Sequence, residues 1–391
     1  MSKQKAKKST AVKKVKRKIN NVKSIIATVL AILLILFVLA CYFYPPLYEA
    51  IKKLFIKDDV ITEFRVEGDT TYIVSGDMPD LKIHFVDVGQ GDCILIELPD
   101  GKNVIIDSGE NNYSDLKSYI DENTSIKSFD YAIATHADSD HIKNFDEILR
   151  DFEVKKIYRP HVLYTGNKYN FSSDFNKGGS KGSKDSVTYA EFLRAVDNET
   201  YIDNGVTKDA DWEFFTHESD FAGKISINEQ IYEYYFDFLT PRVESFSDIN
   251  YKNANDYSPI IKFTYCDVDV LFTGDAEGGN EGDAEDDFVS IYSDLGVSVD
   301  VEILKVSHHG SKTSTTEEFL ELVKPEYAVI QCGLNNEYGH PTQVVLDRLL
   351  NVNTSVYRND LQGDVLLTIN NLGEFNFSTQ KTAISDLYDG Y

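Results

Sequence analysis

The chain of 391 residues contains only four cysteines, and methionine and tryptophan are also rare, with two and one residues. Cys41 lies in a long apolar run, and no two cysteines have the C-x-x-C spacing of metal or redox motifs. Cys93, Cys266 and Cys332 each lie inside a shorter strand-like apolar run. We therefore predict buried free thiols and expect neither a disulfide framework nor cysteine catalysis.

Basic residues are scarce outside the N-terminus. Ten of the 39 Lys and Arg lie within residues 1–24, which contain no acid, so the remainder has 29 basic against 64 acidic residues, a formal charge of −35. The negative charge of residues 25–391, which we call the body, makes nucleic-acid binding unfavourable. Proteins that bind nucleic acid gain affinity from basic patches and counterion release. A polyanion would need a local basic groove, for which the candidates are Lys168, Lys177, Lys181 and Lys184.

Residues 25–44 contain no charged side chain. Twenty apolar residues are about what a helix needs to cross roughly 30 Å of hydrocarbon. With the basic flank, this run predicts a single transmembrane helix in a bacterial cell membrane, with the tail in the cytoplasm and the body outside. A cleaved signal peptide is the alternative, but no A-x-A-like site follows the run. Lipid attachment at Cys41, in the weak match Val38-Leu39-Ala40-Cys41, would give the same location.

One short segment concentrates metal-binding side chains: Thr135-His136-Ala137-Asp138-Ser139-Asp140-His141. It follows the apolar run Tyr131–Ala134, so it lies at the carboxyl end of an expected strand, where α/β proteins place their sites. Residues two apart in an extended or turning chain point the same way. His136 and Asp138 can therefore hold one metal, while Asp140 and His141 face a second. A chance occurrence in an acidic surface loop is the alternative for this motif alone.

Further apolar runs end in acidic or imidazole side chains. Asp107 ends the run Val104–Ile106, Asp275 follows Val270–Gly274, and the pair His308-His309 follows Val301–Ser307. Each alone is explained by a helix cap or a turn acid. Together they predict strands whose ends converge at one edge of a sheet sandwich.

The order of the motifs VDVGQGD, IIDSG, THADSDH, FTGDAE, LKVSHHGS and YGHP resembles the metallo-β-lactamase fold. It is most similar to the hydrolase domain of the ComEC competence proteins and their single-domain relatives, over about Leu81 to Phe377. The resemblance implies an α/β (α+β) protein, an αββα sandwich preceded here by the transmembrane helix. It also implies a centre of two divalent metal ions, with His136 and Asp138 on one ion, Asp140 and His141 on the other, Asp275 bridging, one of His308 and His309 completing the set, and Asp87 and Asp107 in support.

Two features depart from the commoner family pattern. Asp138 replaces a second histidine, and the usual third histidine is missing from the segment Asn255-Asp256-Tyr257-Ser258. That segment resembles the N-D-x-S element of the competence-type proteins, so Asn255, Asp256 and Ser258 mark the region of a third ligand. Oxygen ligands in place of imidazoles make a β-lactamase or glyoxalase assignment unfavourable and move the metal preference from zinc toward manganese or magnesium. Zinc stays open, because histidines are still present.

Four side chains are candidates for the chemistry beyond metal binding: Asp140, Lys305, His308 and His340. His340, in Tyr338-Gly339-His340-Pro341, matches the family's G-H-P element and is either a proton donor to the leaving group or a structural residue. Lys305 alternates with apolar neighbours, so it either aims its charge at a phosphate or pairs with an acid.

The expected organisation follows from these motifs. Residues 45–80 are a juxtamembrane connector with a small hairpin from Phe64 to Val74, residues 81–378 the hydrolase domain and residues 379–391 a tail. A polar insertion at about 163–228, with a short helix from Tyr189 to Val196, is expected to be a solvated loop or a substrate lid. The acid run Glu277–Asp287 is expected to be solvated surface, with weak calcium binding as the alternative.

These observations predict a membrane-anchored metallohydrolase that uses water activated by two Zn or Mn ions. The resemblance implies a phosphodiester substrate, with a DNA strand as the candidate. An esterase for phosphorylcholine is an alternative, because an acidic, aromatic-rich surface suits a cationic head group. A catalytically silent binding module on a membrane stalk is another. The sequence points to no protein partner and leaves the oligomeric state open.

Overall fold

The computed structural model describes residues 62–390 except 244, 246, 247, 250, 252, 281 and 384, and for residues 179–182 the backbone only. The predicted basic tail, the run 25–44 and Cys41 lie outside the described residues. Among the residues described, no helix combines the length and the apolar composition needed to cross a membrane.

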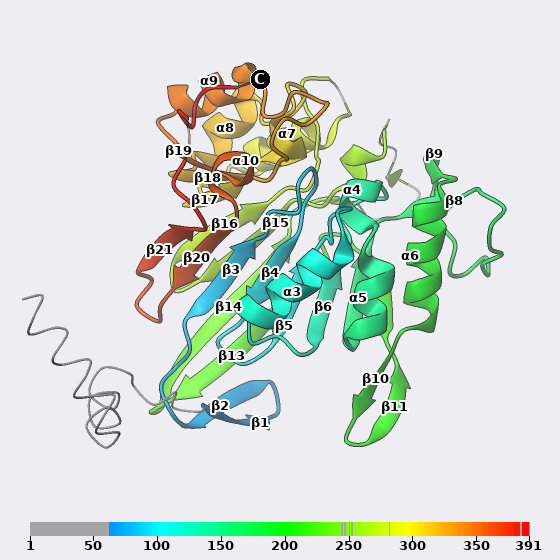
Figure 1. Ribbon diagram of the computed structural model, residues 1–391, viewed down its shortest axis with the longest axis vertical. Helices are drawn as coiled ribbons and strands as arrows, with labels where there is room; N and C mark the ends of the chain where they lie inside the picture. Colours follow the sequence, from blue (N-terminus) through cyan, green and yellow to red (C-terminus); the bar gives the residue numbers. More distant parts are fainter. Residues whose placement is uncertain are drawn as a thin grey trace, which may run out of the picture. The chain divides into compact units, whose positions relative to one another are not determined.

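Two large mixed sheets form the described unit, Thr62–Tyr391 (Figure 1). The eight-stranded sheet has the order β12 (Asp211–Phe214), β7 (Val154–Arg159), β6 (Phe129–Ile133), β5 (Asn103–Ile106), β4 (Ile94–Glu97), β3 (Leu81–Phe85), β20 (Val365–Ile369) and β21 (Phe375–Thr379). The nine-stranded sheet has the order β1 (Glu63–Glu67), β2 (Thr70–Ser75), β13 (Phe221–Ile227), β14 (Gln230–Phe238), β15 (Ile261–Tyr265), β16 (Val268–Phe272), β17 (Ile303–Lys305), β18 (Tyr327–Ile330) and β19 (Ser355–Arg358).

Alternation along the strands places the two sheets face to face. In β4, Ile94 and Ile96 join a core shared by both sheets, while Leu95 joins a second core that includes the helices. In β16, Val270 and Leu271 divide in the same way. Because successive strand residues point to opposite faces, each sheet has helices on its outer face and the other sheet on its inner face. The expected mixed α/β sandwich is confirmed.

The helices divide between the two sheets (Figure 1). The first sheet is accompanied by α3 (Tyr113–Asn123), α4 (Ser139–Ile142), α5 (Phe145–Asp151) and α6 (Val187–Asn198). The second is accompanied by α7 (Ala284–Leu295), α8 (Glu317–Val323), α9 (Gln343–Asn351) and α10 (Asn359–Gln362). Two 3-10 turns, η2 (Asn255–Tyr257) and η3 (Ser307–Gly310), lie in the loops that follow β14 and β17.

The domain boundaries differ from the prediction. The expected hairpin is present as β1 and β2, but β2 also pairs in parallel with β13, so it belongs to the nine-stranded sheet rather than to a connector. At the other end, the Arg358 guanidinium donates hydrogen bonds to the carbonyls of Leu387 and Asp389. The segment after residue 378 therefore packs on the domain.

The prediction of a polar insertion at 163–228 is wrong for most of that segment. It contains β9 (Gly179–Lys184), the small hairpin β10 (Thr200–Asp203) with β11 (Val206–Asp209), and strands β12 and β13 of the two large sheets. The segment begins within β8 (Val162–Tyr164), and its helix α6 buries Tyr189, Phe192 and Leu193. Charged residues on the outer faces of these elements hide the apolar alternation that places them in the fold.

The three described cysteines are free. Cys93 and Cys332 are buried as predicted, whereas Cys266 is partly exposed. Cys266 does not lie within a strand but in the turn that joins β15 and β16, with a positive φ of 49°. Its position in a turn explains why its thiol reaches solvent.

Candidate metal centre

Parallel strands bring the candidate side chains to one edge of the sandwich. In the first sheet β5 and β6 run parallel, so Asp107 and His136 follow neighbouring carboxyl ends. In the second sheet β16 and β17 run parallel, and Asp275 and His308 follow their carboxyl ends. The loops after parallel strands meet at the same edge, which is where α/β sheets bind ligands.

Four buried side chains form what we call the inner group: Asp92, His141, Asp275 and His309. One ligand atom from each lies within 4.8 Å of the other three. The Nε2 atoms of His141 and His309 lie 3.3 and 3.4 Å from Asp275 Oδ2, and 3.3 Å from each other. Such a set of imidazole and carboxylate ligands is suited to a divalent transition metal.

The hydrogen bonds of the inner group show that its atoms fit a cation. His309 Nδ1 lies 2.8 Å from the carbonyl of Gln331, which only accepts, so this nitrogen carries the proton. His141 Nδ1 lies 2.6 Å from Asp107 Oδ2 and is held in the same way. Neutral rings in these tautomers turn the Nε2 lone pairs toward each other at 3.3 Å. Two facing lone pairs repel unless a positive ion lies between them.

Charge around the inner group points the same way. Burial alone would lower the pKa of His141 and of His309, but Asp275, with Asp107 and Asp92 nearby, raises both pKa values well above the usual one. Burial would raise the pKa of Asp275, and the surrounding histidines lower it well below the usual value. The group therefore favours bound positive charge, which a metal ion supplies.

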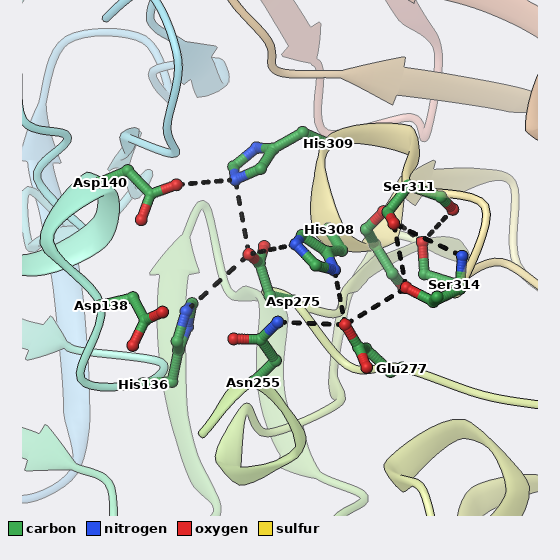
Figure 2. A network of polar contacts seen from close by, with 12 residues as sticks. His136, Asp138, Asp140, Asn255, Asp275, Glu277, His308, His309, Ser311 and Ser314 are labelled. Carbon is green, nitrogen blue, oxygen red and sulfur yellow. Dashed lines mark hydrogen bonds and ion pairs between the residues drawn. The ribbon is translucent and has the colours of Figure 1, made fainter. Parts of the chain in front are cut away.

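Four side chains that are more exposed than the inner group form what we call the outer group: Asp138, Asp140, Glu277 and His308. Their exposed fractions range from 18% for Glu277 to 33% for Asp138. Asp140 Oδ2 lies 3.3 Å from His309 Nε2, and His308 Nε2 lies 3.7 Å from Asp275 Oδ2 (Figure 2). The outer group thus borders the inner group on its solvent side.

His136 completes the set of side chains around Asp275. Its Nε2 lies 3.8 Å from Asp275 Oδ2 and, among the described residues, has no hydrogen-bond partner although it is buried. A buried imidazole nitrogen without a partner is costly, and a metal ion would satisfy it. The structure therefore places the seven predicted metal-site residues together: His136, Asp138, Asp140, His141, Asp275, His308 and His309.

The backbone at His308 and His309 is unusual, and it aims both rings at Asp275. Their φ angles are 46° and 54°, followed by 83° at Gly310. Left-handed backbone costs a residue with a side chain about 1 kcal/mol, so two in succession indicate a turn held by its surroundings. Where the resemblance implied one ligand from this pair, both Nε2 atoms approach Asp275.

The N-D-x-S segment supports the centre instead of entering it. Ser258 Oγ accepts a hydrogen bond from the amide of Asp275 and lies 3.3 Å from His136 Nδ1. Asp256 Oδ1 accepts from the amides of Glu277 and Ala284, and burial raises its pKa to about 7. Asn255 donates to Glu277 Oε1 at 3.1 Å. These contacts shape the loop around Asp275, and a third ligand from this segment stays a prediction.

Two other predicted residues have structural roles. Lys305 is fully buried, with its Nζ 2.6 Å from Asp92 Oδ2, so the alternative of an ion pair is what the structure shows. Asp87 is exposed, and its carboxylate accepts from the amide of Gly89, so it caps a turn. Asp107, by contrast, contacts the site through His141, and its carboxylate also accepts hydrogen bonds from the amide and the hydroxyl of Thr135.

Two acidic residues of the site were missed in the sequence. Asp92 joins the inner group, and its Oδ1 lies 3.2 Å from His309 Nδ1. Glu277, assigned to a solvated acid run, has its Oε1 3.0 Å from His308 Nδ1. The spacing Asp275-x-Glu277 was the available signal, because side chains two apart in an extended loop face the same way.

His340 stands beside both histidines of the pair. Its ring centroid is 5.5 Å from that of His308 and 6.3 Å from that of His309. Burial, together with the charges of His308 and His309, lowers the pKa of His340 to about 4. Its Nδ1 is buried and has no hydrogen-bond partner among the described residues. The position suits contact with a bound substrate.

Comparison with known proteins agrees with the fold and the motifs. Residues 86–221 match the model of the metallo-beta-lactamase superfamily. ComE operon protein 3 of Bacillus subtilis (strain 168) is 28% identical over 301 residues, covering 73% of this chain and 32% of that protein. Competence protein ComA of Neisseria gonorrhoeae is 32% identical over 128 residues, covering 33% of this chain and 17% of that protein. Residues 86–221 thus belong to a metallo-β-lactamase-fold domain, and the chain is similar to the competence proteins.

The ComEC-like domain spans less than a third of the length of the curated relatives that it matches. Among solved structures it is similar to the short form of human tRNase Z, at 11% identity and a TM-score of 0.32, over 66% of this chain and 97% of that one. A subclass B3 metallo-β-lactamase from a soil metagenome library matches at 9% identity and a TM-score of 0.28, over 60% and 83%.

Proposed function

We propose that this ComEC-like chain is a membrane-anchored phosphodiesterase that uses two divalent ions, Mn²⁺ or Zn²⁺, to hydrolyse phosphodiester bonds outside the cytoplasm, with a DNA strand as the candidate substrate. The observation that carries the proposal is the inner group, in which two imidazole lone pairs and a buried carboxylate converge on one point. The competence proteins among its relatives support the choice of substrate class.

The side chains divide the work of the site. Bound divalent ions would supply Lewis acidity to a phosphoryl group and lower the pKa of an attacking water. Asp107 and the carbonyl of Gln331 hold His141 and His309 with their Nε2 atoms toward the site, and Glu277 does the same for His308. His340, with its Nδ1 free of a partner among the described residues, would hydrogen-bond the leaving oxygen.

The test is an assay of the purified full-length chain on single-stranded DNA, duplex DNA and bis(p-nitrophenyl) phosphate, with added Mn²⁺ or Zn²⁺. We expect metal-dependent cleavage that chelation abolishes, with close to two ions per chain by elemental analysis. Absence of bound metal, with no activation by either ion, would contradict the dinuclear assignment. Metal binding without turnover on any phosphoester would favour the silent binding module.

A phosphorylcholine esterase is the second candidate. Tyr338 has 69% of its surface exposed, and its ring stacks at 5.8 Å from that of His340. An exposed aromatic ring beside His340 on an acidic protein suits a cationic head group better than a polyanion. Including p-nitrophenylphosphorylcholine in the assay separates the two candidates, because a choline esterase would prefer it to bis(p-nitrophenyl) phosphate.

The anchor is tested separately from the chemistry. Ten basic residues beside an uncharged run of twenty would keep the N-terminus in the cytoplasm. Protease added to intact cells should then degrade the domain and spare the tail. Protection of the domain would reverse the orientation.

A further inference from the structure

The three described side chains among the lysines proposed for a basic groove, Lys168, Lys177 and Lys184, do not gather into one. Lys168 pairs with Glu191, and the Nζ of Lys177 lies 3.6 Å from Asp174 Oδ1. Lys184 alone among these three described side chains reaches the candidate metal centre, where its Nζ lies 2.5 Å from Asp138 Oδ1. Among the described side chains of this set, Lys184 is therefore the one cation at the rim of the centre.

The backbone around Lys184 is held on both sides. Tyr164 of β8 is its partner in the parallel β8–β9 pair, and the amide of Thr165 donates to the carbonyl of Lys184. Two residues further on, the Ser186 hydroxyl accepts from the amide of Tyr189 and begins α6. Figure 1 shows β9 beside the N-terminal end of this helix. The backbone of Lys184 is therefore positioned by ordered elements and not by a free loop, which leaves its ammonium group within reach of the centre.

Exposure distinguishes Lys184 from the other lysine near the centre. Lys305 has no exposed side-chain surface, and Asp92 holds its charge. Lys184 and Asp138 are 28% and 33% exposed. An ion pair with this exposure contributes little to stability, so Lys184 can readily exchange Asp138 for another anion. Lys184 can meet a substrate, whereas Lys305 cannot.

Charge gives the reason that a substrate anion needs this lysine. The centre contains the carboxylates of Asp92, Asp138, Asp140 and Asp275, with Glu277 beside them. A phosphodiester brings a further negative charge to this acidic surface. An ammonium group on a flexible stem binds phosphate as a point charge and lowers the local repulsion.

We propose that Lys184 binds a non-bridging oxygen of the substrate phosphate beside the metal centre, exchanging its partner Asp138 for the substrate. The inference rests on the proposed phosphoester hydrolysis and adds a specificity-determining residue that comes from the β8–β9 segment. In this arrangement Asp138 is released toward the metal as the ammonium turns to the phosphate.

Lys184→Gln removes the charge and keeps most of the length, and Lys184→Arg restores the charge. Lys168→Gln is the matched control, because it removes a paired lysine from the same segment. With the Mn²⁺-loaded full-length chain, titration of inorganic phosphate followed by calorimetry should show affinity about 10-fold or more weaker in Lys184→Gln. Lys184→Arg should recover part of the affinity, and Lys168→Gln should match the wild type.

Metal affinity and kinetics decide between binding and architecture. In Lys184→Gln the Mn²⁺ affinity should stay equal or become tighter, because the ammonium no longer competes for Asp138. With bis(p-nitrophenyl) phosphate, KM should rise while kcat changes less. Unchanged phosphate affinity and KM in Lys184→Gln would overturn the inference, as would weakened Mn²⁺ binding that Lys184→Arg does not restore.

The phosphate titration also separates this inference from the proposed function. If the wild type cleaves no phosphoester but Lys184→Gln still loses phosphate affinity, the proposed function fails and the anion site stands. If the wild type cleaves phosphodiesters and Lys184→Gln matches it in KM and phosphate affinity, only the role of Lys184 fails.

Discussion

The inner and outer groups of the centre differ in what holds their imidazoles. His141 and His309 are buried, and their Nδ1 atoms meet Asp107 and the carbonyl of Gln331, which lie inside the protein. His308 is 20% exposed, and its Nδ1 meets Glu277, which is 18% exposed. Electrostatic interactions are stronger where water is excluded. On the proposed function, the buried side of the centre would retain an ion and the more exposed side would meet the substrate.

Asp275→Asn should have the largest effect. The carboxylate of Asp275 is the common neighbour of His136, His141, His308 and His309, so its loss affects both groups at once. We expect hydrolysis at the background rate and a lower metal content by elemental analysis. Retention of two ions with normal turnover would show that Asp275 does not join the two groups.

His340→Ala should reduce the rate without removing metal. Its ring lies beside those of His308 and His309. If it assists the leaving oxygen, the rate on DNA should fall by roughly 10²–10⁴. A nitrophenyl ester needs little assistance and should be affected less. Equal losses on both substrates, or loss of metal, would assign His340 a structural role.

Asp107→Asn and Glu277→Gln compare the two groups directly. Removing the hydrogen-bond partner of a metal-binding histidine typically lowers the metal affinity by about 10–100-fold. Asp107 is buried and holds His141 at 2.6 Å, so Asp107→Asn should weaken Mn²⁺ binding by about 100-fold. Glu277 is partly exposed, so Glu277→Gln should weaken it by about 10-fold. Equal losses, measured by competition with a chelator, would remove the distinction between the groups.

Glu97 forms a buried pair with His84 that resembles the pair of Asp107 with His141 but lies away from the centre. Glu97→Gln should therefore leave metal binding unchanged and lower the stability of the fold. Burial raises the pKa of Glu97, but hydrogen bonds from His84 and Ser125 outweigh it and lower the pKa to about 2. Because the folded-state pKa is below the unfolded one, the carboxylate stabilises the fold above about pH 4.5, by about 3 kcal/mol, and this is lost as the pH falls toward 2.

Urea unfolding of wild type and Glu97→Gln at pH 7 and pH 3 measures this contribution. The difference between the two proteins should be largest at pH 7 and should shrink at pH 3. A difference that is the same at both pH values would show that Glu97 stabilises the fold by packing alone.

Local pattern was enough to predict much of the fold. Short apolar runs that end in Asp107, Asp275 and His308 are strands, because β-branched and aromatic residues on a buried pleat leave little alternative. The family and the mixed α/β fold are confirmed on the same motifs. Local pattern did not predict the strands of the segment 163–228. The elements of this segment are short. β12 pairs with β7 and β13 pairs with β2, both far away in the chain, although β13 also pairs with the neighbouring β14.

The site shows the same limit. The motif of His136 to His141 predicted side chains that the structure places together, because the spacing within one loop is local. Asp92, Glu277 and Lys184 could not be assigned in the same way. Each contacts a partner that is distant in the sequence: Asp92 contacts His309, Glu277 contacts His308 and Lys184 contacts Asp138. Which acid faces which base across two sheets is decided by the tertiary fold and not by spacing.

The strand β20 has a consequence for how the chain is made. Phe85 of β3 pairs with Val365 of β20, which lies 280 positions later in the chain. During synthesis, β3 is therefore made long before the strand that pairs with this edge. At about 5–20 residues per second, the ribosome needs on the order of tens of seconds to supply it. During that time β3 is a bare edge with buried-type residues, the kind of surface on which chains associate wrongly. Biogenesis of the domain therefore depends on protecting its first sheet until its C-terminal strands arrive.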